Sequence, residues 1–170
     1  MIAYGAAAAA TPELQVLAQL LGAESSLKWT PGTSAFAQAA AKVPGASVRS
    51  GLYSYSDASL FAVVVQAPTD AGVKAVAQDV AAAIKSSTSN IKEDDLKRAI
   101  AKAQFAEATK LETADSVIAA VTPAVFGGAL PQAASFSGLS ASAITNAAEA
   151  LFSAKPTVVA VGNTHVLPYA

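Results

Sequence analysis

Cysteine is absent from this sequence of 170 residues, and histidine occurs only once. Without cysteine the chain forms neither a disulfide bond nor a thiolate metal site, a composition that fits a reducing compartment without identifying one. A zinc peptidase motif needs two histidines one helical turn apart, whereas His165 stands alone. The sequence therefore excludes a complete zinc peptidase site within these residues, and we expect no metal and no cofactor.

Charged residues are scarce, and neither sign dominates. Eleven basic and twelve acidic residues leave a formal net charge of -1 at neutral pH. No stretch gathers lysine and arginine into the patch that a phosphate backbone requires. We therefore expect no nucleic-acid partner.

Long apolar runs are missing as well. The longest, Leu60 to Val65 and Ser116 to Leu130, are too short or too interrupted for the roughly 20 residues that span a bilayer. The opening residues, Met1 to Tyr4, and the alanines after them lack the basic start of a secretory signal and the arginine and serine of a transit peptide. We expect no membrane span, and any targeting signal would lie outside this chain.

Apolar residues are abundant, at 53% of the chain against 14% charged residues. This balance is typical of a folded protein, and the length predicts one domain over residues 1–170. Much of the apolar content is alanine, which buries little area per residue, so that a large partner surface would add to the stability.

Capping residues and apolar periodicity predict six helices. Thr11 and Pro12 mark the start of the first and Gly22 marks its end, while Ser140 caps the last. The predicted helices are Thr11 to Gly22, Ser34 to about Val43, Thr69 or Asp70 to Ser86, a long helix from Lys92, Thr113 to about Pro123, and Ser140 to the residues before Pro156.

The helical period disappears between Ser47 and Ala67, which predicts a hairpin that turns at Asp57-Ala58-Ser59. Its second strand, Leu60 to Val65, is apolar on both faces, as in a central strand that is covered on both sides. A final strand is expected over Thr157 to Val161. The order strand, helices, hairpin, paired helices, helix, strand predicts an α+β fold with helices packed on a mostly antiparallel mixed sheet.

No reactive side chain falls in a catalytic or binding motif. Gly-x-Ser-x-Gly, Gly-x-Gly-x-x-Gly and Gly-Lys-Ser/Thr are all absent. The remaining candidates are better explained by structural roles: His165 as a surface or turn residue, Gly127-Gly128 as a turn, Tyr53 and Tyr55 as sheet residues, and Trp29 as a loop anchor. Glu93, Asp94 and Asp95 form a solvated helix start, in which Asp94 is expected to pair with Arg98. We therefore predict no catalytic, cofactor-binding or metal-binding residue.

Three segments resemble a known family. The hairpin from Gly51 to Phe61 resembles the Tyr-x-Asp-x-Gly-Leu-Phe stretch of the C-terminal domain in the pitrilysin-like metallopeptidase superfamily, with Ser59 in place of its glycine. Thr11-Pro12-Glu13-Leu14 followed by Leu20-Leu21-Gly22 resembles the first helix of that domain. The end of the chain, Gly162-Asn163-Thr164-His165 with Leu167-Pro168-Tyr169, resembles the tail of the core protein 2 family of the mitochondrial cytochrome bc complex, ubiquinol:cytochrome c reductase.

The resemblance implies a domain that has lost its peptidase function. Active members of the superfamily carry the zinc motif in the N-terminal domain, and they tend to supply an arginine and a tyrosine just before this hairpin that reach the substrate. The matching positions here are Ala39 and Ala46. Alanine offers no donor that would stabilise an oxyanion or hold a peptide.

By resemblance the chain would be a non-catalytic structural part of respiratory complex III on the matrix side of the inner mitochondrial membrane. Its expected partners are the N-terminal half of the same subunit, the homologous core protein 1 and other complex III subunits. Two alternatives stay open: the C-terminal domain of a processing peptidase subunit or related zinc metallopeptidase with its zinc motif upstream, and a non-catalytic subunit that binds presequences.

Overall fold

The computed structural model describes residues 1–7, 9–22, 32–89, 91–109, 112–126, 134–163 and 165–167. The predicted order of elements is confirmed within these ranges. The elements are β1 (Ile2–Ala6), α1 (Pro12–Leu21), α2 (Ala35–Ala41), β2 (Ser47–Ser54), β3 (Ser59–Gln66), α3 (Asp70–Ser87), α4 (Glu93–Thr109), α5 (Ala114–Val125), α6 (Ala141–Phe152) and β4 (Thr157–Val158).

The predicted capping residues begin the helices as expected. Thr11 Oγ1 accepts a hydrogen bond from the Leu14 amide at 3.5 Å, and Ser140 Oγ accepts one from the Ala143 amide at 3.2 Å. Of the two candidates for the start of α3, the cap is Thr69. These side chains satisfy amides that the first helical turn leaves without a partner.

The four strands form one sheet in the order β2-β3-β1-β4, and all three pairings are antiparallel. The hairpin prediction is confirmed, because β2 and β3 pair along their full lengths. The expected final strand to Val161 is wrong in length, since β4 ends at Val158. Its neighbour explains this: Val158 lies opposite Ile2, and Val159 donates to the Met1 carbonyl at 2.9 Å, where the register of β1 runs out.

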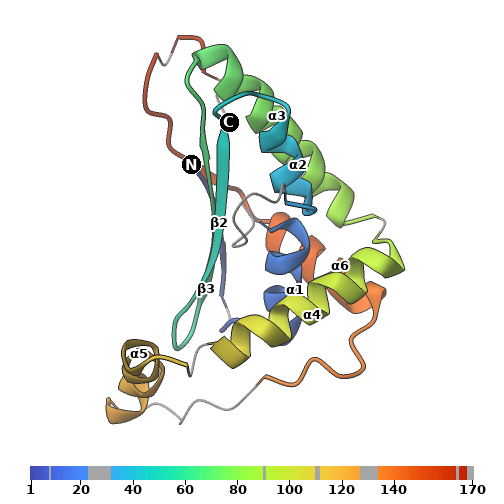
Figure 1. Ribbon diagram of the computed structural model, residues 1–170, viewed down its shortest axis with the longest axis vertical. Coiled ribbons are helices and arrows are strands. Elements are labelled where there is room, and N and C mark those ends of the chain that lie inside the picture. Colours follow the sequence, from blue (N-terminus) through green and yellow to red (C-terminus); the bar gives the residue numbers. More distant parts are fainter. Residues whose placement is uncertain are drawn as a thin grey trace.

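Five helices lie together on one side of the sheet. Figure 1 shows the sheet nearly edge-on, with α1, α2, α3, α4 and α6 on the same side of it. The position of β3 inside the sheet agrees with the prediction, but the expected cover on both faces is wrong for the described part of the chain. Phe61 and Val63 face the helices and are buried, whereas Val64 faces the other way and is half-buried.

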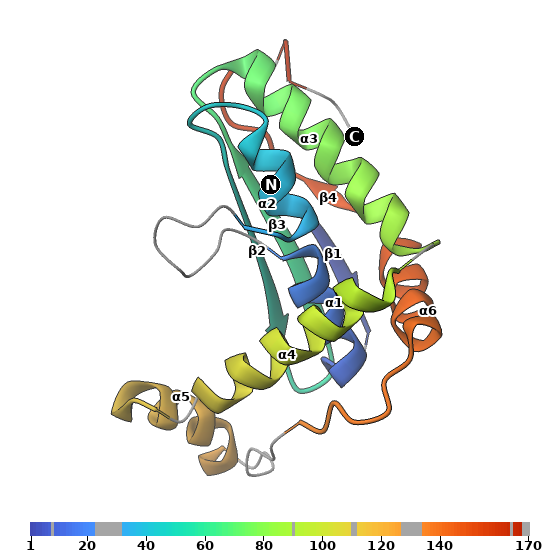
Figure 2. The same ribbon diagram turned by 45° about the vertical axis from the view of Figure 1, so that its right-hand side comes forward.

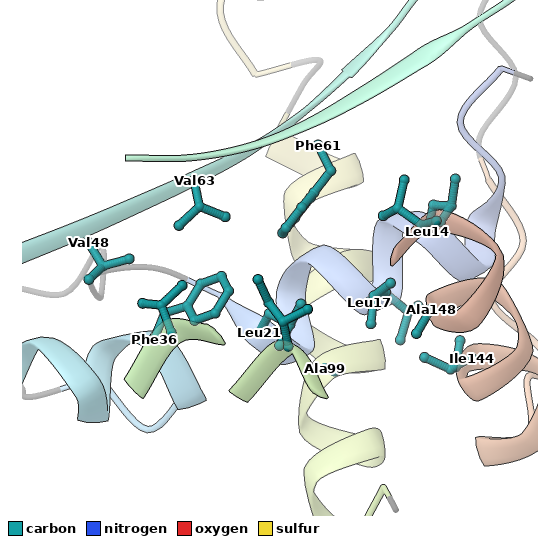
Figure 3. Close-up of a cluster of buried hydrophobic side chains, with 14 of the residues drawn as sticks. Leu14, Leu17, Leu21, Phe36, Val48, Phe61, Val63, Ala99, Ile144 and Ala148 are labelled. Carbon is teal, nitrogen blue, oxygen red and sulfur yellow. The ribbon is translucent and has the colours of Figure 1, made fainter. Parts of the chain in front are cut away.

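Helix α1 occupies the centre of the core. It packs against α2, α3, α4, α6 and β2, and its apolar face supplies Leu14, Leu17 and Leu21. Figure 3 shows these side chains between Phe61 and Val63 of the sheet and Ile144 and Ala148 of α6. The short residue Ala99 lets α4 approach α1 closely.

Candidate functional site

The one histidine does not belong to a reactive cluster. The imidazole of His165 is exposed, and its backbone amide donates to Asn163 Oδ1 at 3.3 Å, which is the geometry of a turn. Among the described residues, no group of three or more His, Cys, Asp or Glu side chains is placed to hold a metal ion. The interpretation of His165 as a surface or turn residue therefore agrees with the structure.

The acidic start of α4 pairs with the basic residues that follow it. Glu93 contacts Lys97 Nζ at 2.8 Å, and Asp95 forms the ion pair with Arg98. The expected partner of Arg98 was Asp94, so that prediction was wrong by one residue: the spacing i,i+3 brings Asp95 to the guanidinium instead. The hydrogen bond and the positive charge of Lys97 lower the pKa of the Glu93 carboxyl. These pairs are exposed, as a solvated face requires.

Ala39 and Ala46, which the resemblance places at the arginine and tyrosine positions of active relatives, have different environments. Ala39 lies in α2, is 4% exposed and belongs to the hydrophobic core. Ala46 immediately precedes β2 and is half-buried against that core. Neither position presents a hydrogen-bond donor from its side chain to a substrate.

The surface carries a polar cleft of about 170 Å³ near the start of α4. Hydroxyl and amide side chains line it together with Lys92, Lys102 and the pair of Asp95 and Arg98. Two of the hydroxyls that line it are engaged with the backbone of α3, because Ser86 Oγ donates to the Ala83 carbonyl at 2.8 Å and Ser87 Oγ donates to the Ile84 carbonyl at 2.6 Å.

A second hollow, of about 390 Å³, lies between α3 and α6. Tyr4 and Phe152 line it and meet edge to face, with ring centroids 4.9 Å apart. Burial raises the pKa of the Tyr4 hydroxyl. The lining also includes Lys85 and Glu149. Sequence reasoning missed this hollow, because its residues come from three separate elements.

Small residues line the face of the sheet that the five helices leave open. Ala62 lies opposite both Gly51 and Ala3, so that one row across three strands consists of glycine and alanine. The ring of Tyr53 lies over Gly51, where an added Cβ would come within 3.2 Å of it, and Tyr53 itself is exposed. The prediction of Tyr53 and Tyr55 as sheet residues is confirmed for Tyr53, which lies in β2, and is wrong for Tyr55, which follows directly after that strand.

Several large apolar side chains are exposed on α5 and directly after it, and one, Phe105, is exposed on the second half of α4. Phe105 is 68% exposed and Ile118 is 64% exposed, and Phe126, which follows α5, is 85% exposed. The predicted start of α5 is confirmed, since Thr113 Oγ1 accepts from the Ser116 amide at 3.2 Å. Trp29 and Gly127-Gly128, which we interpreted as an anchor and a turn, lie outside the described residues.

No helix among the described residues is both long enough and apolar enough to cross a membrane. The described part of the chain also holds no group of three or more His, Cys, Asp or Glu side chains that could bind a metal ion. Its charged residues are mostly exposed, and its two hollows are open to solvent.

The chain is similar to core subunits of the cytochrome b-c1 complex along its whole length. It is 52% identical over 170 residues to cytochrome b-c1 complex subunit 2 of Cryptococcus neoformans, covering 100% of this chain and 39% of the relative. It is 36% identical to the subunit of the same name from Neurospora crassa, covering 94% of this chain and 36% of the relative. The chain thus spans well under half the length of these relatives.

A solved structure shares the fold. A chain of complex III2 from Candida albicans, with Inz-5 bound, matches with a TM-score of 0.73 and 16% identity, over 87% of this chain and 38% of the other. The family described as the peptidase M16 inactive domain matches residues 4–103, which include the first helix and the hairpin used above as markers. This chain belongs to the peptidase M16 inactive domain family.

Proposed function

We propose that the chain is a structural, non-catalytic part of a core subunit in respiratory complex III. The observation that carries this proposal is the 52% identity over all 170 residues to a protein named subunit 2 of the cytochrome b-c1 complex. Identity of that level along the whole chain supports the same assembly role for this protein. The chain would support electron transfer without performing it.

The proposed role defines the partners. Residues 1–170 would form a single domain that corresponds to the C-terminal half of the subunit, and the N-terminal half of the same polypeptide would pack against it. Core protein 1 and other complex III subunits would be the further partners, on the matrix side of the inner mitochondrial membrane. The proposal includes no nucleic acid, no membrane span by this domain and no cofactor bound to it.

The non-catalytic part of the proposal is supported by the burial of Ala39 and Ala46 and by the low number of histidine and cysteine residues. Ala39 is enclosed in the core and Ala46 is half-buried, so neither position supplies a donor for a peptide substrate. The sequence has one histidine and no cysteine. A zinc peptidase site needs more ligands of these types than the chain contains, so no such site is complete within these residues, and the zinc motif of an active relative would lie in its N-terminal domain.

The test is purification of the full-length gene product with an affinity tag from solubilised mitochondria of its own organism, with mass spectrometry of the co-purifying proteins. We expect cytochrome b, cytochrome c1 and the Rieske protein in stoichiometric amounts, with haem absorbance in the same fraction. Recovery of one homologous zinc-motif subunit alone would overturn the proposal in favour of a processing peptidase. An untagged strain is the control for carry-over.

A second assay addresses catalysis directly. The purified full-length gene product is dialysed against a weak chelator, and its zinc content and its cleavage of a mitochondrial presequence peptide are measured. We expect no stoichiometric zinc and no cleavage. Zinc retained at one ion per chain would contradict the non-catalytic assignment.

A further inference from the structure

The polar cleft near the start of α4 carries an excess of positive charge. Its walls are the ends of α1 and α3, the start of α2 and the first half of α4. In Figure 2, α3 ends next to the start of α4, and α4 runs across α1. The charged side chains that line the cleft are three basic ones and one acidic one, namely Lys92, Arg98, Lys102 and Asp95. The whole chain has a formal net charge of -1, so this positive charge is a local feature.

The basic residues of the cleft lie on one stripe of α4. After Lys92, which directly precedes the helix, Asp95, Arg98 and Lys102 follow at intervals of three or four residues. This spacing places side chains on the same face of a helix. Lys97 belongs to a different face, because it does not line the cleft and its ammonium group is paired with an acidic neighbour. The stripe therefore brings three cations to one concave surface, which attracts anions.

Two of these three cations have no carboxylate beside them. Within the described ranges, neither Lys92 nor Lys102 forms an ion pair. Arg98 donates to Asp95 through Nη2. A guanidinium group has five N–H donors in a fork, so it can hold a second anion at the same time. The cleft thus offers more positive charge than its own carboxylate neutralises.

The volume of the cleft limits the size of an anion that it can hold. At about 170 Å³ it is smaller than the pockets of roughly 300–1,000 Å³ that take drug-sized ligands. A phosphate group is small enough, whereas a whole nucleotide is not. Phosphate also carries about two negative charges and several acceptor oxygens, so cations along one stripe can contact it together.

We propose that this cleft binds a phosphate group, with Lys92, Arg98 and Lys102 as its contacts. The hydroxyl hydrogens of Ser86 and Ser87 are donated to backbone carbonyls of α3, so the three cations supply the attraction. A free phosphate ion and the phosphate of a lipid headgroup share this chemistry. The site goes beyond the proposed structural role and does not depend on it, because its charges and its volume belong to this domain alone.

The test measures how phosphate protects lysines of the full-length gene product, purified in the assembly in which it occurs. An amine-reactive label is added with and without inorganic phosphate, at an ionic strength that chloride keeps constant, and mass spectrometry gives the labelling rate of each lysine. At about ten times the dissociation constant of phosphate, we expect Lys92 and Lys102 to react about tenfold more slowly, because only the unoccupied fraction is labelled. Lys74 and Lys97, which are exposed outside the cleft, are internal controls and should react at unchanged rates.

Two matched variants separate a binding site from the general effect of charge. Lys102→Gln removes one cation from the cleft and should raise the dissociation constant of phosphate, measured through Lys92, about threefold to fivefold, as expected for one exposed charge pair. Lys97→Gln removes the same charge from the other face of α4 and should leave that constant unchanged. Equal dissociation constants in the two variants would overturn the proposal. Absent protection of Lys92 and Lys102, or equal protection of Lys74 and Lys97, would overturn it as well.

A second ligand identifies the source of the phosphate. Dihexanoyl phosphatidic acid is a water-soluble lipid whose headgroup is a phosphate monoester, and it is titrated in the same labelling assay. A dissociation constant equal to that of inorganic phosphate supports a free phosphate ion as the ligand. Binding that is at least about tenfold tighter supports a lipid headgroup. Protection of Lys92 and Lys102 by neither ligand would refute the site for both sources.

Discussion

Helices α1 and α5 are close in length and both rich in apolar residues, yet they have opposite environments. Helix α1 buries Leu14, Val16, Leu17 and Leu21, and the rest of the domain is arranged around it. Helix α5 buries none of its described side chains. The contrast shows that apolar periodicity identifies a helix but not its partner. A sequence pattern reports what a segment needs, and only the fold reports whether the same domain supplies it.

The sharpest test of this contrast compares Phe61→Ala with Phe105→Ala. Phe61 is 1% exposed and meets the ring of Phe152 at 5.8 Å, so its removal leaves a cavity and should lower the free energy of unfolding by about 3–5 kcal/mol. Phe105 is exposed, and its replacement should change the stability of this domain by less than about 0.5 kcal/mol. Chemical denaturation of the two variants measures both values. Equal losses in the free energy of unfolding would mean that Phe105 packs against the rest of the domain in solution.

The next largest effect is expected at the junction between α1 and α2. Gly22 has φ +62°, and a Cβ there would lie 2.5 Å from the Cβ of Ser34. Gly22→Ala should therefore cost about 3 kcal/mol, as the sum of a left-handed backbone and a clash with the start of α2. Gly138→Ala is the matched control, because φ is +79° but nothing lies within 4 Å. It should cost only the backbone contribution, about 1 kcal/mol. Similar decreases in the melting temperature of the two variants would show that Gly22 and Ser34 move apart and relieve the clash.

The interior of the body contains a serine that should lower its stability. Ser59 is 2% exposed, and its Oγ has no hydrogen-bond partner among the described residues. Ser59→Ala should raise the free energy of unfolding by about 1 kcal/mol, because it removes the cost of burying an unpaired hydroxyl. In the control Ser87→Ala, the lost Oγ donates to the Ile84 carbonyl at 2.6 Å, so stability should fall. A loss in both variants would indicate that a buried water serves Ser59.

The smallest effect belongs to the exposed pair that begins α4. Lys97 lowers the pKa of Glu93, so the pair stabilises the fold above the ordinary pKa of a glutamate, and this contribution disappears as the pH falls through the lowered pKa. Because both groups are exposed, only a slight change in stability is expected. Lys97→Met should bring the Glu93 pKa back toward its ordinary value, which carboxyl NMR titration measures. An unchanged titration would show that Lys97 does not affect Glu93 in solution.

The sequence predicted those parts of the fold that depend on local chemistry. Thr11, Ser140 and Gly22 define helix ends through their own backbone and side-chain bonds, and the hairpin follows from β-branched runs around a short turn. The length of β4 was not predictable, because it depends on where the register of β1 ends. The partner of Arg98 was wrong by one residue, since i,i+3 and i,i+4 neighbours are almost equally close.

The sequence predicts no catalytic, cofactor-binding or metal-binding residue, so it names no site whose geometry the structure could confirm. Among the described residues, no group of side chains is placed to hold a metal ion. The features that the structure adds are surface features. The hollow beside Tyr4 and Phe152 and the row of Ala3, Gly51 and Ala62 come from segments far apart in the chain. Only the fold makes neighbours of them, so no pattern in the sequence could indicate them.

The pairing of β1 with β4 has a consequence for how the protein is made. Ile2 lies opposite Val158, so the two partners are separated by almost the whole chain. At typical rates of translation, roughly 10–30 s pass between their emergence from the ribosome. During that time one edge of β1 has no strand beside it, and an open edge readily pairs with other chains. The sheet is therefore complete only after Thr157 and Val158 have followed, and β1 is the segment that a chaperone would need to protect until then.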